Sequence, residues 1–376
     1  MTFVGERRAA KTPVGALLGA LALSIAPAGC VDEAEAPRDA SAWTFVGEFA
    51  FAPEDNQLLT EALTLDADGQ GFALFAEVEG CAQIALLEDE AQAWVGALES
   101  GPSCVSCAER FSVIAGEGLW VHHAAAASSG PTQLRVGAID CDTLTRARPS
   151  EDTPPGSVRL WARELPAVPS EVEVPLRFSH GSFSSWSSAD ESEALVEAVS
   201  ELFAPAGVAL VLDDSTNDEA LPTALAWFEG QPGALAPHVG GEPGVVEVVF
   251  AGCLEHVHPA LGSQTTLDGL VPRIPAQDSV GAGVFLRGRA CAEAELGPTA
   301  FPLDAQAQLL AHELGHYLGL YHSMEASGIT DRLDDTDDGT LMAPKPMLVA
   351  EPVFSPAQAE RMRLHAALLR EPPPLR

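Results

Sequence analysis

Three histidines and one glutamate near the C-terminus have the types and spacing of a hydrolytic metal site. They lie in the stretch Leu310-Ala-His-Glu-Leu-Gly-His-Tyr-Leu-Gly-Leu-Tyr-His322, which reads H-E-x-x-H-x-x-G-x-x-H. On a helix, His312 and His316 fall one turn apart on the same face, so both imidazoles can bind one Zn²⁺ ion. The carboxylate of Glu313 can take a proton from a water molecule at that ion. The spacing therefore predicts metal-assisted hydrolysis.

The elements that must position these residues are a helix and a tight turn. Glycine tolerates the left-handed backbone conformation, so Gly319 is expected to end the helix. The chain can then turn back and bring His322 to the metal as a third ligand. Three protein ligands leave one coordination position open, which is typical of catalytic zinc sites. A buried helix face is predicted by apolar residues at helical spacing, namely Ala307, Leu310, Ala311, Leu314 and Leu318.

The stretch resembles the zinc signature of the metzincin metallopeptidases. In that clan a methionine in a tight turn follows the third histidine, and Met342 in Gly339-Thr-Leu-Met-Ala-Pro344 is the matching residue. The segments Asp334–Asp338, Leu341–Met342 and Phe354–Met362 are similar to the pappalysin-like branch. Some metzincins also carry a tyrosine just after the turn methionine, and this chain departs from that pattern, because its only tyrosines precede the turn.

The resemblance covers roughly the C-terminal half of the chain and implies a fold, a cofactor and a substrate class. The fold is an α+β domain with a mixed twisted sheet, a zinc helix, a Met-turn and a C-terminal helix. The cofactor is one catalytic Zn²⁺, and the substrate is a protein or peptide held along an edge strand. Gly281–Leu286 is the segment we assign to that strand. Lys345 follows the turn, where metzincins shape the pocket for the residue after the cleaved bond, and it favours an acidic side chain there.

The N-terminus predicts export. Residues 1–29 read as a signal peptide, with Arg7, Arg8 and Lys11 before the apolar run Val14–Ala26. The run ends at Pro27-Ala-Gly-Cys30, which resembles a bacterial lipobox that would place lipid on Cys30. Pro27 departs from the usual aliphatic residue, so full secretion is the alternative to a cell-envelope lipoprotein. Contact with a membrane is expected only through that lipid anchor.

Cysteine usage agrees with an oxidising compartment. The chain has seven cysteines, and six remain when Cys30 is set aside. Cys253 and Cys291 are the natural disulfide pair of the C-terminal half. The other four, Cys81, Cys104, Cys107 and Cys141, allow three disulfide connectivities. Cys104 and Cys107, which are three residues apart, could instead form a redox or zinc pair.

Composition excludes some partners. The formal net charge of −34 at pH 7 argues against nucleic acid and anionic membrane surfaces. The sequence does not indicate an oligomeric state. Calcium binding is an option at the acidic run Asp331–Asp338, although a solvated acidic loop is favoured there. His256 and His258 could hold a second metal if they lie on one strand face, although loop or core histidines are more common.

The chain divides into two folded regions. Residues 30–42 are polar and read as a flexible tether. Residues 43–166 contain short runs of valine, leucine and phenylalanine between turn signals, which predicts an all-β sandwich-like domain. Its position suits a propeptide, whereas its cysteines suit a stable accessory module. The zinc peptidase domain is predicted at 167–371, followed by a disordered tail at 372–376.

Elements of the second region follow from hydrophobic periodicity. Val172–Phe178 and Val208–Leu212 are predicted strands, and Ala189–Phe203 between them has helical spacing. This order implies a crossover and a partly parallel sheet. Val245–Phe250 suits a central strand. Ser355–Leu369 predicts a closing helix with Ser355 as N-cap and a proline in its first turn.

Three classes of function remain at this stage. The first is a zinc endopeptidase that uses Glu313 as general base. The second is a surface binding or adhesion lipoprotein with an idle or latent metal site, and the intact Glu313 argues against it. The third is a zinc hydrolase acting on another acyl group, which the motif alone does not exclude.

Overall fold

The computed structural model describes parts of the chain between residues 43 and 371. The described residues are 43–51, 57–59, 71–88, 93–96, 112–123, 133–138, 156–228, 235, 238–239, 244–257, 264–272, 283–288, 301–324, 331, 333, 335–337 and 339–371. The expected signal peptide, Cys30, the tether and the tail lie outside these ranges, so those assignments stay predictions. Within these ranges no helix has both the length and the apolar character that crossing a bilayer requires.

The first folded region is an antiparallel sheet around one long strand. Its strand path is β1-β7-β3-β6-β2, and β4 and β5 also pair with β3. One face is packed around Phe72, Leu74, Leu134 and Leu160. The described strands of this region form a single sheet, so the predicted sandwich is not confirmed. The strands are β1 (Thr44–Ala50), β2 (Gln57–Leu59), β3 (Gly71–Glu88), β4 (Ala93–Gly96), β5 (Ser112–His123), β6 (Gln133–Ala138) and β7 (Ser157–Glu164).

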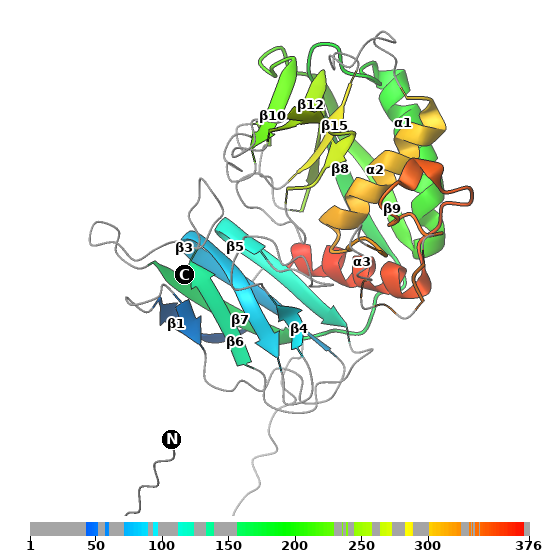
Figure 1. Cartoon of the computed structure of the whole chain (residues 1–376). Helices are drawn as coiled ribbons and strands as arrows, with labels where there is room; N and C mark the ends of the chain where they lie inside the picture. The colour runs from blue at the N-terminus through cyan, green and yellow to red at the C-terminus, as the bar shows by residue number, and fades with distance from the viewer. Residues whose placement is uncertain are drawn as a thin grey trace, which may run out of the picture. The chain divides into compact units, whose positions relative to one another are not determined.

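The second folded region is an α+β unit built on a mixed sheet (Figure 1). The order of the five strands is β14-β15-β11-β8-β9, with β14 antiparallel and the others parallel. A separate three-stranded sheet has the order β10-β12-β13. The strands are β8 (Val172–His180), β9 (Val208–Asn217), β10 (Ala224–Phe228), β11 (Val246–Ala251), β12 (Cys253–Val257), β13 (Gln264–Thr266), β14 (Gly269–Leu270) and β15 (Val284–Arg287).

The predicted crossover is present between β8 and β9. Helix α1 (Ala189–Phe203) connects these two parallel strands. It begins in a capping box, in which Ser188 Oγ accepts from the backbone N–H of Glu191 and the Glu191 carboxylate accepts from the backbone N–H of Ser188. After a short 3₁₀ turn, η1 (Ala204–Ala206), Gly207 adopts the left-handed conformation at φ 71° and the chain enters β9.

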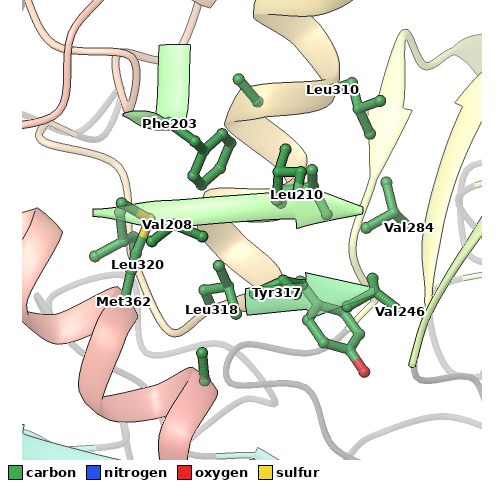
Figure 2. Packing of buried hydrophobic residues seen from close by; sticks show 14 of the residues in the cluster. Phe203, Val208, Leu210, Val246, Val284, Leu310, Tyr317, Leu318, Leu320 and Met362 are labelled. Carbon is green, nitrogen blue, oxygen red and sulfur yellow. The ribbon is translucent and has the colours of Figure 1, made fainter. Parts of the chain in front are cut away.

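Helices pack on one face of the five-stranded sheet. Alternate residues of the parallel strands point toward α1, α2 (Leu303–Tyr317) and α3 (Pro356–Leu369). Figure 2 shows Leu210, Val246 and Val284 from three strands converging on Leu310 and Leu318 near the metal-site motif. Burial of this apolar surface stabilises the helix that carries the motif, at about 25 cal/mol per Å² removed from water. Helix α3 begins with Ser355 as N-cap, as predicted.

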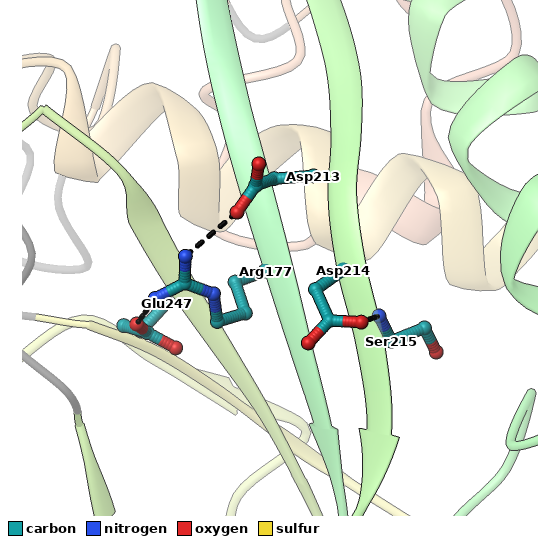
Figure 3. A network of polar contacts seen from close by, with 5 residues as sticks. All are labelled: Arg177, Asp213, Asp214, Ser215 and Glu247. Carbon is teal, nitrogen blue, oxygen red and sulfur yellow. Dashed lines mark hydrogen bonds and ion pairs between the residues drawn. The ribbon is translucent and has the colours of Figure 1, made fainter.

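The opposite face of the sheet contains a charged network. Arg177 on β8 lies between Glu247 on β11 and Asp213 on β9 (Figure 3). Its guanidinium is 3.2 Å from Glu247 Oε1 and 2.7 Å from Asp213 Oδ2. Glu247 is almost fully buried, whereas Asp213 is exposed. The network therefore joins three adjacent strands of the sheet.

One predicted strand role is wrong. Gly281–Leu286 was assigned to the substrate-binding edge, but Val284–Arg287 form β15, which lies between β14 and β11. The edge next to β15 is β14, which consists of Gly269 and Leu270 only. Two residues are too few to show the alternating pattern by which a strand is recognised in a sequence.

Candidate metal centre

Helix α2 positions two of the predicted ligands and then ends where the motif predicts. The helix runs from Leu303 to Tyr317 and is buried along most of its length. Gly319 has φ 89°. Its N–H donates to the carbonyl of His316, and the N–H of Leu320 donates to the carbonyl of Gly315. These two bonds are a Schellman motif, which reverses the chain after the helix.

The reversal brings His322 to the other two histidines. The Nε2 atoms of His312 and His316 are 3.0 Å apart, and His322 Nε2 lies 3.2 Å from His316 and 3.3 Å from His312. Within the described part of the chain, these three residues are the only group of three or more His, Cys, Asp or Glu side chains whose ligand atoms converge as a metal site requires. His312 and His316 are buried, and His322 is half-buried.

Hydrogen bonds on the far side of two rings set the state of the facing nitrogens. His312 Nδ1 donates to the carbonyl of Leu341, and His316 Nδ1 donates to the carbonyl of Leu320, both at 2.8 Å. A carbonyl only accepts, so each Nδ1 carries the proton and each neutral ring presents a bare lone pair at Nε2. Lone pairs facing one another at 3.0 Å repel unless a cation lies between them.

The spacing of the nitrogens fits zinc. With Zn–N bonds of roughly 2.0–2.1 Å, two ligands of a tetrahedral ion lie about 3.3–3.4 Å apart. The observed separations of 3.0–3.3 Å need only a small expansion. Three imidazoles, two of them neutral and oriented by second hydrogen bonds, are also a donor set that zinc prefers.

Burial keeps the rings neutral. It lowers the pKa of His312 to about 4, an effect opposed by the Leu341 carbonyl and increased by His322. Burial also lowers the pKa of His316 well below its usual value, and the neighbouring histidines lower it further. The two rings therefore do not need to lose a proton to bind a metal at neutral pH.

The turn that contains Met342 lies directly against the ligand helix. Leu341 and Met342 are fully buried. The carbonyl of Leu341 accepts from His312, and the carbonyl of Met342 accepts from the N–H of Ser323 at 2.9 Å. The predicted turn residue is thus adjacent, through backbone groups, to the segments that carry His312 and His322.

Glu313 is also on α2 but its carboxylate faces the edge strand. The side chain is 6% exposed. Burial raises its pKa to about 8, the charge of Asp268 adds to the effect, and a hydrogen bond from the backbone N–H of Val271 opposes it. Because Glu313 follows His312 directly, the structure brings all four predicted chemical residues onto one helix end and the turn that follows it.

The described aspartates of the acidic run Asp331–Asp338 accept hydrogen bonds that stabilise turns and a helix end. Asp335 accepts from Ser355 Oγ at 2.8 Å and from the N–H of Ala357 at 3.0 Å, so it caps α3. Asp331 accepts from the N–H of Leu333, and Asp337 accepts from the N–H of Gly339. These contacts are typical of turns, and calcium binding stays a prediction.

The structure describes one of the two cysteines of the predicted disulfide. Cys253 is buried and disulfide-bonded. Cys291 lies outside the described residues, as do Cys104, Cys107, Cys141 and His258. The Cys253–Cys291 pairing and the second metal site therefore stay predictions.

An open depression of about 850 Å³ borders the segment that follows Met342. Lys345, Asp337 and Glu351 are its charged lining residues. Leu348 is 77% exposed at its margin, which is unusual for a large apolar side chain.

Sequence reasoning missed the neighbours of Glu313. The charge of Asp268 acts on its carboxylate, and the backbone N–H of Val271 donates to it. Gly269 lies against it and has no side chain to displace it. None of these belongs to a metal motif. The only signal was the Asp268-Gly269 dipeptide, which reads as a turn.

Comparisons with known proteins give two distant likenesses to solved structures. The sequence matches no protein-family model, and no curated protein is similar to it. A promirolysin variant from Tannerella forsythia has 16% identity and a TM-score of 0.37, over 53% of this chain and 82% of that one. Metalloproteinase-II from Bacteroides fragilis has 13% identity and a TM-score of 0.29, over 55% and 62%. At these values the likeness carries no argument about fold or function.

Proposed function

We propose that this chain is a zinc-dependent endopeptidase of the metzincin type, most similar to the pappalysin-like branch. The observation that carries the proposal is the set of three Nε2 atoms within 3.3 Å of one another. Two of them have their lone pairs directed inward by the hydrogen bonds at Nδ1. Glu313 on the same helix supplies the proton acceptor that hydrolysis requires.

The site residues have separate roles in the proposed reaction. His312, His316 and His322 would hold the ion, which when bound supplies Lewis acidity and activates water at neutral pH. In its ionised form, which an adjacent cation would favour against the effect of burial, Glu313 accepts one proton from the attacking water and later donates it to the leaving amine, so the proton count balances. The carbonyls of Leu341 and Leu320 keep two ligand rings in one orientation throughout.

Substrate binding is proposed at the edge strand and the depression. The outer side of β14 is an unpaired strand edge within the described sheet, so an extended peptide can add to it by backbone pairing. Lys345 lines the depression beyond Met342, and its charge favours an acidic residue after the cleaved bond.

Export is proposed as the setting of this activity. The signal-like start and Cys30 indicate a lipoprotein of the cell envelope, and full secretion is the alternative. The disulfide-bonded state of Cys253 supports an oxidising compartment. Incorporation of labelled fatty acid into wild type and not into Cys30→Ala would establish the anchor, whereas equal labelling of both would exclude it.

Metal content and peptide cleavage, measured on one purified sample beside Glu313→Gln, test the proposed activity. We expect one zinc per chain in both forms and a loss of cleavage of roughly 10²–10⁴-fold in the variant. Zinc without cleavage in either form would favour the adhesion alternative. Cleavage of esters but not of a peptide library would favour another acyl hydrolase. A folded sample that binds no zinc would refute the metal site.

A further inference from the structure

The backbone of the edge strand lies unusually close to the Glu313 carboxylate. A Cβ atom at Gly269 would be 2.5 Å from Oε1 of Glu313, 2.7 Å from its Cγ and 2.8 Å from its Cδ. Such separations are shorter than any non-bonded carbon contact tolerates. Two residues later, the backbone N–H of Val271 donates to the same carboxylate. The glutamate therefore occupies the volume that a side chain at position 269 would need.

The requirement for glycine at this position is one of space. Gly269 is not among the described glycines with positive φ, which are Gly71, Gly207, Gly244 and Gly319. Any residue could adopt its backbone conformation if the volume beside it were free. Its role differs from that of Gly319, whose φ of 89° is what ends the ligand helix.

The strand is fixed in place by Arg287. The guanidinium of Arg287 forms an ion pair with Asp268 at 2.6 Å, and the Arg287 N–H donates to the Asp268 carbonyl at 3.1 Å. The same guanidinium lies over the ring of Phe301, 4.5 Å from its centre, just before α2 begins. One side chain thus connects the residue beside Gly269 to the start of the ligand helix.

The ligand helix is fixed as well. Leu310 and Leu314 are fully buried in the core, and Gly315 lies against Met342. The helix is therefore held on its core side by fully buried residues. If a methyl group were added at position 269, the Glu313 side chain is the group that would move, because it is the only flexible partner in the contact.

We propose that Gly269 is a positioning residue for Glu313. Its missing side chain lets the carboxylate stand against the edge strand and accept from Val271, and so fixes the carboxylate relative to the three histidines. This role in the reaction rests on the proposed peptidase function, whereas the contact itself does not. A displacement of about 1 Å at a reacting group can lower a rate by roughly 10²-fold.

A double-mutant cycle on the metal-free protein tests the contact without reference to activity. Gly269→Ala is measured in wild type and in Glu313→Ala, where the carboxylate is gone. We expect Gly269→Ala to lower Tm by roughly 3–8 °C in wild type and by much less in Glu313→Ala. An equal loss in both backgrounds would overturn the proposal. If Gly269→Ala alone does not fold, a folded double variant supports the proposal and an unfolded one refutes it.

Gly283→Ala is the matched control. It adds the same methyl group directly before β15, where Cβ would lie 2.6 Å from Cγ1 of Val239 and 3.2 Å from the carbonyl oxygen of Glu247, with no Glu313 atom among its three nearest neighbours. We expect its effect on Tm to be the same with Glu313 and with Glu313→Ala. A Gly283→Ala effect that depends on Glu313 as strongly as that of Gly269→Ala would show that the cycle does not report a direct contact, and would overturn the proposal.

Kinetics on the zinc-loaded protein test the role in the reaction. We expect Gly269→Ala to retain one zinc and to lose roughly 10- to 100-fold in kcat at unchanged KM, whereas Gly283→Ala keeps kcat. Unchanged kcat in Gly269→Ala would overturn the positioning role. A zinc-loaded wild type that cleaves no peptide would instead refute the proposed function, and the stability cycle would still decide whether the contact exists.

Discussion

The sulfur of Met342 lies against the backbone of Gly315. A Cβ atom at Gly315 would be 2.5 Å from Sδ of Met342. Gly315 directly precedes the proposed ligand His316, and the carbonyl of Leu341, next to Met342, accepts a hydrogen bond from the proposed ligand His312. The closeness of this helix and this turn is therefore part of what sets the orientation of the ligands.

Gly315→Ala is expected to destabilise the fold by pushing Met342 out of place. Overpacking of a filled core costs about 1–3 kcal/mol in the free energy of unfolding. Urea unfolding of metal-free protein measures it. In a Met342→Ala background the sulfur is absent, so the same substitution should cost clearly less. Equal costs in the two backgrounds would contradict the contact.

Removal of zinc is expected to lower thermal stability. A ligand that binds only the folded state at 100 times its Kd adds about 2.7 kcal/mol. A chelator should therefore lower the Tm of wild type, and it should have little effect on His316→Ala, which lacks a ligand. Calorimetry with and without chelator measures both. A Tm that does not respond to chelator in a sample with bound zinc would contradict this expectation.

Lys345→Glu is expected to change the preferred residue after the cleaved bond. Lys345 is exposed, so solvent screens its charge and the change should be modest, roughly 10-fold in kcat/KM between acidic and basic side chains. A peptide library that varies this one position measures the preference. Lys345→Met, which removes the charge without reversing it, should show no preference for either sign. Identical profiles for all three proteins would place the specificity elsewhere.

Arg177→Met is expected to destabilise the sheet more than Asp213→Asn. Arg177 contacts the buried Glu247 and the exposed Asp213. Loss of the guanidinium from the buried carboxylate should cost about 2–3 kcal/mol, a value reduced for the partial exposure of the arginine. Asp213→Asn should change the free energy of unfolding by less than about 1 kcal/mol. The reverse order in urea unfolding would contradict this reading of the network.

His180 is expected to make the fold sensitive to mild acid. Burial lowers its pKa to about 4, against a usual value of 6.5, and the charge of Glu191 opposes the shift. Below pH 6.5 His180 therefore binds a proton in the unfolded chain, whereas in the folded chain it binds that proton only near pH 4. Stability from this residue is complete above pH 6.5 and is lost as the pH falls to 4, by on the order of 3 kcal/mol.

His180→Phe tests this assignment, because the ring already stacks on Phe250 at 4.7 Å. The variant loses the contacts of Nε2 with Ser192 and Ser215, so it should be less stable than wild type at pH 7. The difference should shrink as the pH falls from 6.5 toward 4. Urea unfolding at several pH values measures it, and a constant difference would assign the acid sensitivity to other groups.

The parts of the site that the sequence could predict are local in the chain. His312, Glu313, His316 and Gly319 lie within one helix and its end, so their geometry follows from helical spacing and from one glycine. The crossover through α1 was also predictable, because its apolar spacing and Ser188 cap are local signals. These interactions do not depend on distant segments.

The parts that could not be predicted depend on distant backbone groups. Gly269 lies in a strand of two residues and Val271 directly follows it, and such a short strand carries no periodicity. The pairing partner of β15 depends on which segment reaches the sheet edge, so the edge role was assigned to Gly281–Leu286 by mistake. The arrangement of the first region likewise depends on how β3 pairs with four other strands.

Because backbone carbonyls orient the His312 and His316 rings, the residues that provide those carbonyls can change their side chains in evolution. His312 and His316 both donate to main-chain carbonyls, at Leu341 and Leu320. A missense change at position 341 or 320 replaces a side chain and leaves the carbonyl in the chain. A site oriented by aspartate or glutamate side chains would lose its acceptor through a single codon change. Here the two rings keep their hydrogen-bond acceptors when residues 341 and 320 are substituted, as long as the replacement residues keep the turn folded.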